Sequence, residues 1–237
     1  MRLFRMPCKL GAMFRTIVLS LLLVSVLAPS PAPAQTPDDT RFYSVSYVDV
    51  NPVSRSMALT TLRRYQDVSH KHSDHIRTEL FEQADRSGRF VIIETWKTQA
   101  AFDANGEVRK ELTDAIQPVR LSDWDIRPYK TLSVPPTAAE AEANAVVVIT
   151  HVDVSPDPKV APLLVTLAEA SRREEGNVRF DVLLHTMRAN HFEVIETWKN
   201  LKALDAHSAA AHTRKYRNDL QQFLGSPLDE RLFKSIQ

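Results

Sequence analysis

The chain has 237 residues, of which 30 are basic and 29 acidic, with five glycines and a single cysteine. A chain of this length folds as one large domain or two small ones. The balanced charge lacks the basic surplus of a nucleic-acid-binding protein, and the glycines form no phosphate-binding loop, which excludes the common nucleotide folds.

The first 34 residues have the pattern of a secretory signal peptide. Four basic residues precede a short apolar run over 17–27, and Ala32-Pro33-Ala34 supplies the small residues that a signal peptidase recognises. The run is shorter than the ~20 residues that span a bilayer, although an uncleaved anchor is the alternative. Cleavage removes Cys8 and leaves 26 basic against 29 acidic residues, a net charge of −3. We therefore expect a periplasmic or secreted protein without disulfides, which binds neither nucleic acid nor, after cleavage, membrane.

The first half of the mature chain, over 42–132, alternates strands and helices. Period-two alternation predicts a strand over 43–50, and Asn51-Pro52 begins a helix that ends near His70. Further strands are predicted over 76–83, 90–96 and 124–129. Thr98 is the predicted N-cap of a second helix. Residues 133–144, which are rich in proline, alanine and glutamate, form the predicted linker.

The second half, over 145–237, repeats this order. Strands are predicted over 146–154, 178–184 and 192–198, with a closing strand around 231–233. Ser155-Pro156 is the expected helix start, and an apolar stripe follows over 160–168. Gly176 is the expected left-handed residue after that helix, and Asn200 the N-cap of the next one.

The two halves share one stretch almost unchanged. Phe90–Lys97 and Phe192–Lys199 agree at six of eight positions, 102 residues apart, which indicates a tandem duplication. Strand–helix–strand–strand–helix–strand predicts an α+β, ferredoxin-like unit with both helices on one sheet face. Apolar residues on both faces of 192–198 show that the other face is buried too. We predict that the two sheets pack face to face as a barrel within one chain.

Three motifs of the second half resemble a known family. They are E-E-G-N-V-R-F-D-V at Glu174–Val182, F-x-V-I-E-T-W-K at Phe192–Lys199 and A-L-D-A-H at Ala203–His207. Together they resemble the antibiotic biosynthesis monooxygenase domain, which belongs to the dimeric α+β barrels. Members of that family are usually homodimers of one domain, so this chain is similar to a dimer fused end to end. The first repeat diverges, with Asn105 in place of His207.

The resemblance implies oxidation of an electron-rich aromatic, such as a hydroquinone or an anthrone, by dioxygen without flavin, metal or haem. Such a site needs an apolar pocket, a base that titrates near neutral pH and donors for the substrate anion. The alternative is a periplasmic module of the same fold that binds a small aromatic, or serves a stress response, without turnover. A haem-degrading relative is disfavoured, because that branch uses a first-strand asparagine that neither repeat has.

The same resemblance suggests the site residues. His207 is the candidate base or proton shuttle, with Trp198 as its catalytic partner; the alternatives are a half-exposed histidine and a core tryptophan. The candidate substrate-binding residues are Asn177, Arg179, Glu196 and Trp96. Asn177, Arg179 and Glu196 have the alternative of being turn or solvated strand residues. His212 is expected on another helical face, at the surface, unless the helix breaks near Ser208.

Residues 70–75 concentrate three imidazoles and a carboxylate. Histidine with carboxylate suits zinc, copper or nickel, but Lys71 lies in the middle of the run and no cysteine accompanies it. We therefore predict a solvated, histidine-rich loop and no metal site.

Overall fold

A computed structural model describes residues 39–135 and 145–236. The predicted leader and most of the predicted linker, over 136–144, lie outside these described residues. Within them, no helix is long and apolar enough to cross a membrane.

Each repeat has the predicted order of elements. The first contains β1 (Phe42–Asp49), η1 (Pro52–Ser54), α1 (Arg55–Ser69), β2 (His75–Gln83), β3 (Arg89–Trp96), α2 (Gln99–Ala104), α3 (Gly106–Ile116) and β4 (Asp125–Ser133). The second contains β5 (Val146–Asp153), α4 (Val160–Ser171), β6 (Asn177–His185), β7 (His191–Trp198), α5 (Leu201–Ala209), α6 (Ala211–Leu220), η2 (Gln221–Phe223) and β8 (Asp229–Ser235).

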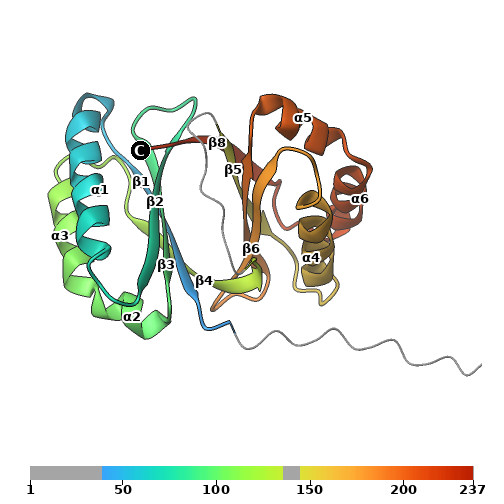
Figure 1. The fold of residues 1–237 in the computed structure, drawn as a ribbon, viewed down its shortest axis with the longest axis horizontal. Helices are drawn as coiled ribbons and strands as arrows, with labels where there is room; N and C mark the ends of the chain where they lie inside the picture. Colours follow the sequence, from blue (N-terminus) through green and yellow to red (C-terminus); the bar gives the residue numbers. More distant parts are fainter. Residues whose placement is uncertain (1–38, 136–144, 237) are drawn as a thin grey trace, which may run out of the picture. The chain divides into compact units, whose positions relative to one another are not determined.

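The strands close into one antiparallel barrel. Their order is β1-β3-β2-β8-β5-β7-β6-β4, so the repeats meet at the β2–β8 and β4–β6 junctions. Helices α1–α3 lie outside the first sheet and α4–α6 outside the second, on opposite sides of the barrel (Figure 1). The prediction of an intrachain dimeric α+β barrel is confirmed.

Three apolar layers follow from period-two alternation. Phe192, Val194 and Trp198 point toward the helices of the second repeat, whereas Ile195 lies in the barrel core with residues of both repeats. A third cluster fills the space between the first sheet and its helices. The expected burial of both sheet faces is thus confirmed, because neighbouring residues along one strand enter different layers.

Strand register defines which residues of the two repeats are counterparts. Trp96 pairs with Phe42 and Trp198 with Val146, so the offset is 102 for β3 and β7 but 104 for β1 and β5. The offset of the shared stretch therefore does not extend to the first strands of the two repeats.

Most local predictions hold. The Thr98 and Asn200 side chains accept hydrogen bonds from the amides of Ala101 and Ala203, as N-caps do. Gly176 has φ +88°, and a Cβ there would lie 2.7 Å from that of Ala203. The left-handed conformation is therefore confirmed, although α4 ends earlier, at Ser171.

Three boundaries were predicted wrongly. Ser155-Pro156 does not cap a helix, because the Asp157 side chain accepts the Lys159 amide (2.8 Å) in a turn and α4 begins only at Val160. The helix after Thr98 is split in two at Asn105. Strand β4 continues to Ser133, well past the predicted end, because pairing with β6 extends it.

Candidate functional site

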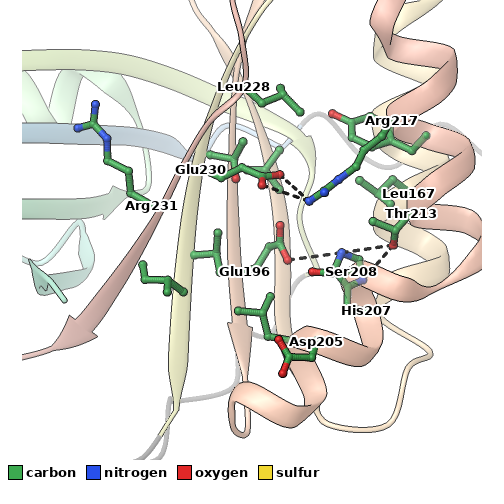
Figure 2. Close-up of a pocket in the computed structure, with 16 residues that line it drawn as sticks. Leu167, Glu196, Asp205, His207, Ser208, Thr213, Arg217, Leu228, Glu230 and Arg231 are labelled. Atoms are coloured by element: carbon green, nitrogen blue, oxygen red, sulfur yellow. Dashed lines mark hydrogen bonds and ion pairs between the residues drawn. The ribbon is translucent and has the colours of Figure 1, made fainter. Parts of the chain in front are cut away.

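The principal cavity of the second repeat measures about 230 Å³ and lies between its sheet and its helices. Val148, Thr150, Val194 and Glu196 form the floor on the sheet. Residues of α4, α5 and α6 form the opposite wall, among them Leu167, His207 and Thr213 (Figure 2). Every lining residue belongs to the second repeat.

Glu196, Trp198 and His207 form a contiguous group at this cavity. Glu196 and Trp198 are two residues apart on β7, so their side chains share the helix-facing side, and the indole Nε1 donates to Glu196 Oε2 at 2.9 Å. The His207 ring stacks on the indole, with centroids 4.6 Å apart and an interplanar angle of 29°. Trp198 is fully buried behind the other two and does not line the cavity.

A break between two helices adds a second histidine. Ala210 has extended backbone (ψ 147°), which ends α5 and turns α6 back toward the site. Glu174 Oε1 then lies 2.6 Å from His207 Nδ1 and 2.9 Å from His212 Nε2. The exception stated for His212 is thus met: the helix breaks near Ser208, and the His212 side chain, 31% exposed, bonds inward to Glu174.

Burial sets the protonation of the group. Desolvation raises the pKa of Glu196 to about 7, partly offset by the indole hydrogen bond. Desolvation also lowers the pKa of His207, while the hydrogen bond to Glu174 opposes that shift. Near neutral pH, a carboxyl group close to its titration point thus faces a neutral imidazole, with 3.7 Å between Glu196 Oε2 and His207 Nε2.

The contacts from Glu196 to His212 indicate a route for a proton to solvent: 3.7 Å separates Glu196 from His207, and hydrogen bonds join His207, Glu174 and His212. The bond to Glu174 places the proton of His207 on Nδ1, which leaves Nε2 as an acceptor that faces Glu196, with the Thr213 hydroxyl 3.5 Å away. Glu174 in turn contacts the partly exposed His212. Glu196, His207, Glu174 and His212 therefore form a chain from the cavity toward the surface.

One buried hydroxyl on the cavity floor has no partner. Thr150 is 4% exposed, lines the cavity, and its Oγ1 makes no hydrogen bond. An unpaired buried hydroxyl costs free energy that a bound polar group would recover. Thr150 and Glu174 were not among the site residues predicted from the sequence. The only available signal for Thr150 was the period-two alternation along β5, the first strand of the second repeat.

Three residues predicted for the pocket lie elsewhere. Phe180 and Val182 face the helices, so Arg179 points into the barrel, where it pairs with Asp181 and, at 2.8 Å, with Glu79 of the first repeat. The Asn177 amide donates to the backbone carbonyl of Arg179. Trp96 packs against Phe102 and the rings of the 70–75 loop.

The histidine-rich loop uses its rings for packing. His75 lies 4.8 Å from both His70 and Trp96, between ring centroids, and its Nε2 is 2.7 Å from Thr78 Oγ1. Within 39–135 and 145–236, the group whose ligand atoms lie within 4.8 Å of one another is instead Glu174, His207 and His212. Two histidines and a carboxylate suit a metal ion, but Glu174 already satisfies both imidazoles without one.

The model of the family described as antibiotic biosynthesis monooxygenase matches residues 41–105 and 145–219. The chain belongs to this family. It is also 33% identical, over 64 residues, to YcnE of Bacillus subtilis, a candidate monooxygenase; the match covers 27% of this chain and 67% of that protein.

Two solved structures of candidate monooxygenases share the fold along most of the chain. The one from Fusobacterium nucleatum has a TM-score of 0.76 and 14% identity, covering 85% of this chain and 94% of its own. The one from Lactobacillus acidophilus has a TM-score of 0.67 and 14% identity, covering 83% and 94%. Membership of the monooxygenase family therefore assigns a general monooxygenase role and a small-molecule substrate.

The first repeat of this monooxygenase-family chain has almost no cavity at the same place. About 10 Å³ remains, lined by Tyr65, Glu94 and Trp124 among others. Tyr65 fills the space, and its hydroxyl donates to Glu94 Oε1 at 2.7 Å. Its counterpart in the second repeat is Leu167, and that of Glu94 is Glu196. Asn105, the counterpart of His207, donates to Ser69 Oγ at 3.2 Å.

Proposed function

We propose that the second repeat oxidises a small hydroquinone with dioxygen and needs no added cofactor. The observation that carries this proposal is the Tyr65–Glu94 contact. In the first repeat, a phenol of the protein itself donates its hydroxyl proton to the buried carboxyl at 2.7 Å. In the second repeat the phenol is absent, the equivalent carboxyl is present, and the vacated space is a cavity of about 230 Å³. A phenolic substrate there would reproduce a contact that the fold already makes.

The size of the cavity favours one or two rings. A cavity of ~150 Å³ is known to accommodate benzene, so about 230 Å³ holds a monocyclic or compact bicyclic hydroquinone. A three-ring anthrone would need displacement of the walls. Among the two substrate classes that the family resemblance implies, we therefore favour hydroquinones.

The residues suit removal of a phenolic proton. Glu196, with a pKa of about 7, would accept it, and His207 Nε2 would receive it in turn. Apolar side chains such as Val148, Leu167 and Val194 would contact the ring, while Arg217 and Glu230 add charged groups to the lining. The Thr150 hydroxyl is available to donate to a second oxygen of the ring.

The oxidation balances without another reductant. The substrate anion donates electrons to dioxygen, and a ring carbon and an oxygen atom form a bond. One oxygen atom stays as a hydroxyl group on the ring and the other leaves as water. The hydroquinone thereby becomes a hydroxyquinone, and the substrate supplies all four electrons that dioxygen accepts.

Dioxygen uptake tests the proposal. The purified protein, treated with a chelator, is supplied with monocyclic and bicyclic hydroquinones and with an anthrone, and product mass is recorded. We expect uptake with the smaller substrates, a product heavier than its substrate by one oxygen atom less two hydrogen atoms, and a ~10²–10⁴-fold loss of turnover in Glu196→Gln. The matched variant Glu94→Gln should retain turnover.

Other outcomes would redirect the assignment. Saturable binding of hydroquinones without uptake would favour the non-catalytic module. Uptake that is lost on chelation and restored by one equivalent of iron(II) would assign Glu174, His207 and His212 as a metal centre. Equal losses from Glu196→Gln and Glu94→Gln would contradict the placement of chemistry in the second repeat.

A further inference from the structure

A second cavity, of about 310 Å³, lies at one end of the barrel beside the β4–β6 junction. Its polar lining consists of three histidines, two arginines and one aspartate: His151, His185, His191, Arg127, Arg188 and Asp125. None of these residues lines the cavity between the second sheet and its helices. Its composition is that of a site for an anion, and it combines strands of both repeats.

The opposite junction shows that barrel closure does not require these histidines. By strand register, the counterparts of His151, His185 and His191 are Tyr47, Gln83 and Arg89. Both junctions close through the same kind of antiparallel pairing. The three imidazoles are therefore a property of one junction, added to a fold that closes without them.

Arg188 is the charge in this cavity that lacks a counter-ion. Its counterpart Arg86 binds Asp49 at 2.8 Å, and Arg89 binds the same carboxylate at 2.7 Å. In the second repeat Asp153 replaces Asp49, but it lies 3.3 Å from His191 and has no ion pair with Arg188. Among residues 39–135 and 145–236, no ion pair or hydrogen bond engages the Arg188 guanidinium.

The other charges facing the cavity are already compensated. Asp125 pairs with Arg127 at 2.6 Å, and the guanidinium of Arg127 lies over the Tyr47 ring. Buried Glu193 accepts hydrogen bonds from Tyr47 and Tyr129, and His151 Nδ1 lies 3.3 Å from its Oε2. Asp125 and Glu193 thus have other partners, and neither forms an ion pair with Arg188.

The imidazoles offer donors to the same space. His185 Nδ1 accepts the Met187 amide at 3.1 Å, which leaves Nε2 to carry the proton. Burial lowers the pKa of His185 and of His191, and the charges of Arg188 and Arg127 lower both further. A bound anion would oppose that repulsion, so its binding and imidazole protonation should favour each other.

We propose that this cavity binds the doubly charged oxyanion group of a small molecule, with Arg188 as its principal ligand and the three histidines as further donors. The site goes beyond the proposed oxidation, because it shares no residue with the hydroquinone cavity. Phosphate-like and paired carboxylate groups both have the required charge, and their geometry differs.

Calorimetric titration with sulfate and, separately, with succinate distinguishes the two groups. Sulfate keeps its charge across the range, so pH 5.5 and pH 7.5 can be compared in metal-free buffer. We expect one saturable site per chain, about tenfold weaker in Arg188→Ala, since a charge-assisted contact is lost. Arg86→Ala, at the other junction, should bind as the wild type does.

The pH dependence follows from the lowered imidazole pKa values. Because the anion favours the protonated rings, affinity should rise as pH falls below ~6.5, the ordinary histidine pKa. His185→Gln, which installs the residue of the other junction, should flatten that dependence. Absence of saturable binding to either anion, or binding that Arg188→Ala leaves unchanged, would overturn the proposal.

Discussion

The two repeats have the same order of strands and helices and the same buried Glu-x-Trp pair, yet the cavity beside that pair is large only in the second repeat. In the first repeat Tyr65 and Trp124 fill the space between sheet and helices, which the smaller Leu167 and Leu228 leave open in the second. The cavity there measures about 10 Å³ in the first repeat and about 230 Å³ in the second. A few side chains that point into the space between sheet and helices decide the difference. The fold positions a carboxyl group twice, and side-chain volume decides where a ligand can reach it.

The electrostatic environment of the buried carboxyl group differs less between the repeats than the volume of the cavity beside it. Burial raises the pKa of Glu94, as it does that of Glu196. What the first repeat lacks is the onward acceptor: Asn105 stands where His207 stacks on Trp198, and an amide does not accept a proton at neutral pH. The first repeat therefore keeps the geometry of a phenol bound to a carboxyl group, without a route for the proton.

The largest expected effect comes from the proton acceptor. His207→Ala should lower turnover by ~10²–10⁴, the usual contribution of general acid–base catalysis, whereas Asn105→Ala should leave it nearly unchanged. Steady-state dioxygen consumption measures both, with circular dichroism to exclude unfolding. A His207→Ala variant with full turnover would remove this residue from the proton route.

Exchanging residues 65 and 167, the counterparts that fill or open the cavity, should give each repeat the cavity size of the other. Leu167→Tyr places a phenol beside Glu196, and we expect kcat/KM to fall by about a hundredfold, or ~2.7 kcal/mol. Tyr65→Leu should open the first cavity and lower the free energy of unfolding by ~2–4 kcal/mol, because it removes buried volume and a hydrogen bond. Dioxygen uptake and denaturant melts measure the two. Unchanged kcat/KM in Leu167→Tyr would mean that substrate does not enter this cavity.

Trp198 should act through Glu196 and not through substrate contact. Its indole hydrogen bond holds the pKa of Glu196 below the value that burial alone would give. Trp198→Phe should therefore shift the acid limb of the kcat/KM profile to higher pH and lower activity at pH 7 by about tenfold or less. Trp96→Phe is the control. A change in KM with an unmoved pH profile would instead indicate direct substrate contact.

The raised pKa of Glu196 should also make the free energy of unfolding depend on pH. The pKa of Glu196 rises from 4.5 to about 7 on folding, so the folded state retains its proton between these values while the unfolded state loses it. Stability contributed by this group is complete below pH 4.5 and declines as pH rises through 7, by about 3 kcal/mol at most. Glu196→Gln should lack that decline, which thermal melts at pH 5 and pH 8 would reveal. Identical pH dependence in both proteins would contradict the raised pKa.

Local patterns were sufficient for much of this protein. The repeated F-x-x-I-E-T-W-K stretch indicated the duplication, and apolar residues on both faces of β7 predicted the barrel, because a strand buried on two sides needs two covering layers. Thr98 and Asn200 were recognisable as caps, since capping depends on neighbours within a few residues. Glu196 and His207 were named from their motifs, and both line the cavity.

Tertiary structure alone decided the rest. Arg179 lies on β6, next to the strand that carries Glu196, yet it points into the barrel and contacts Glu79 of the other repeat. The sequence around Arg179 could not predict this contact, because it joins residues a hundred positions apart. The break at Ala210 brings His212 to Glu174, and Tyr65 closes the first cavity, only once helices are packed on sheets. Motifs report local geometry; which side chains share a space depends on how distant segments pack.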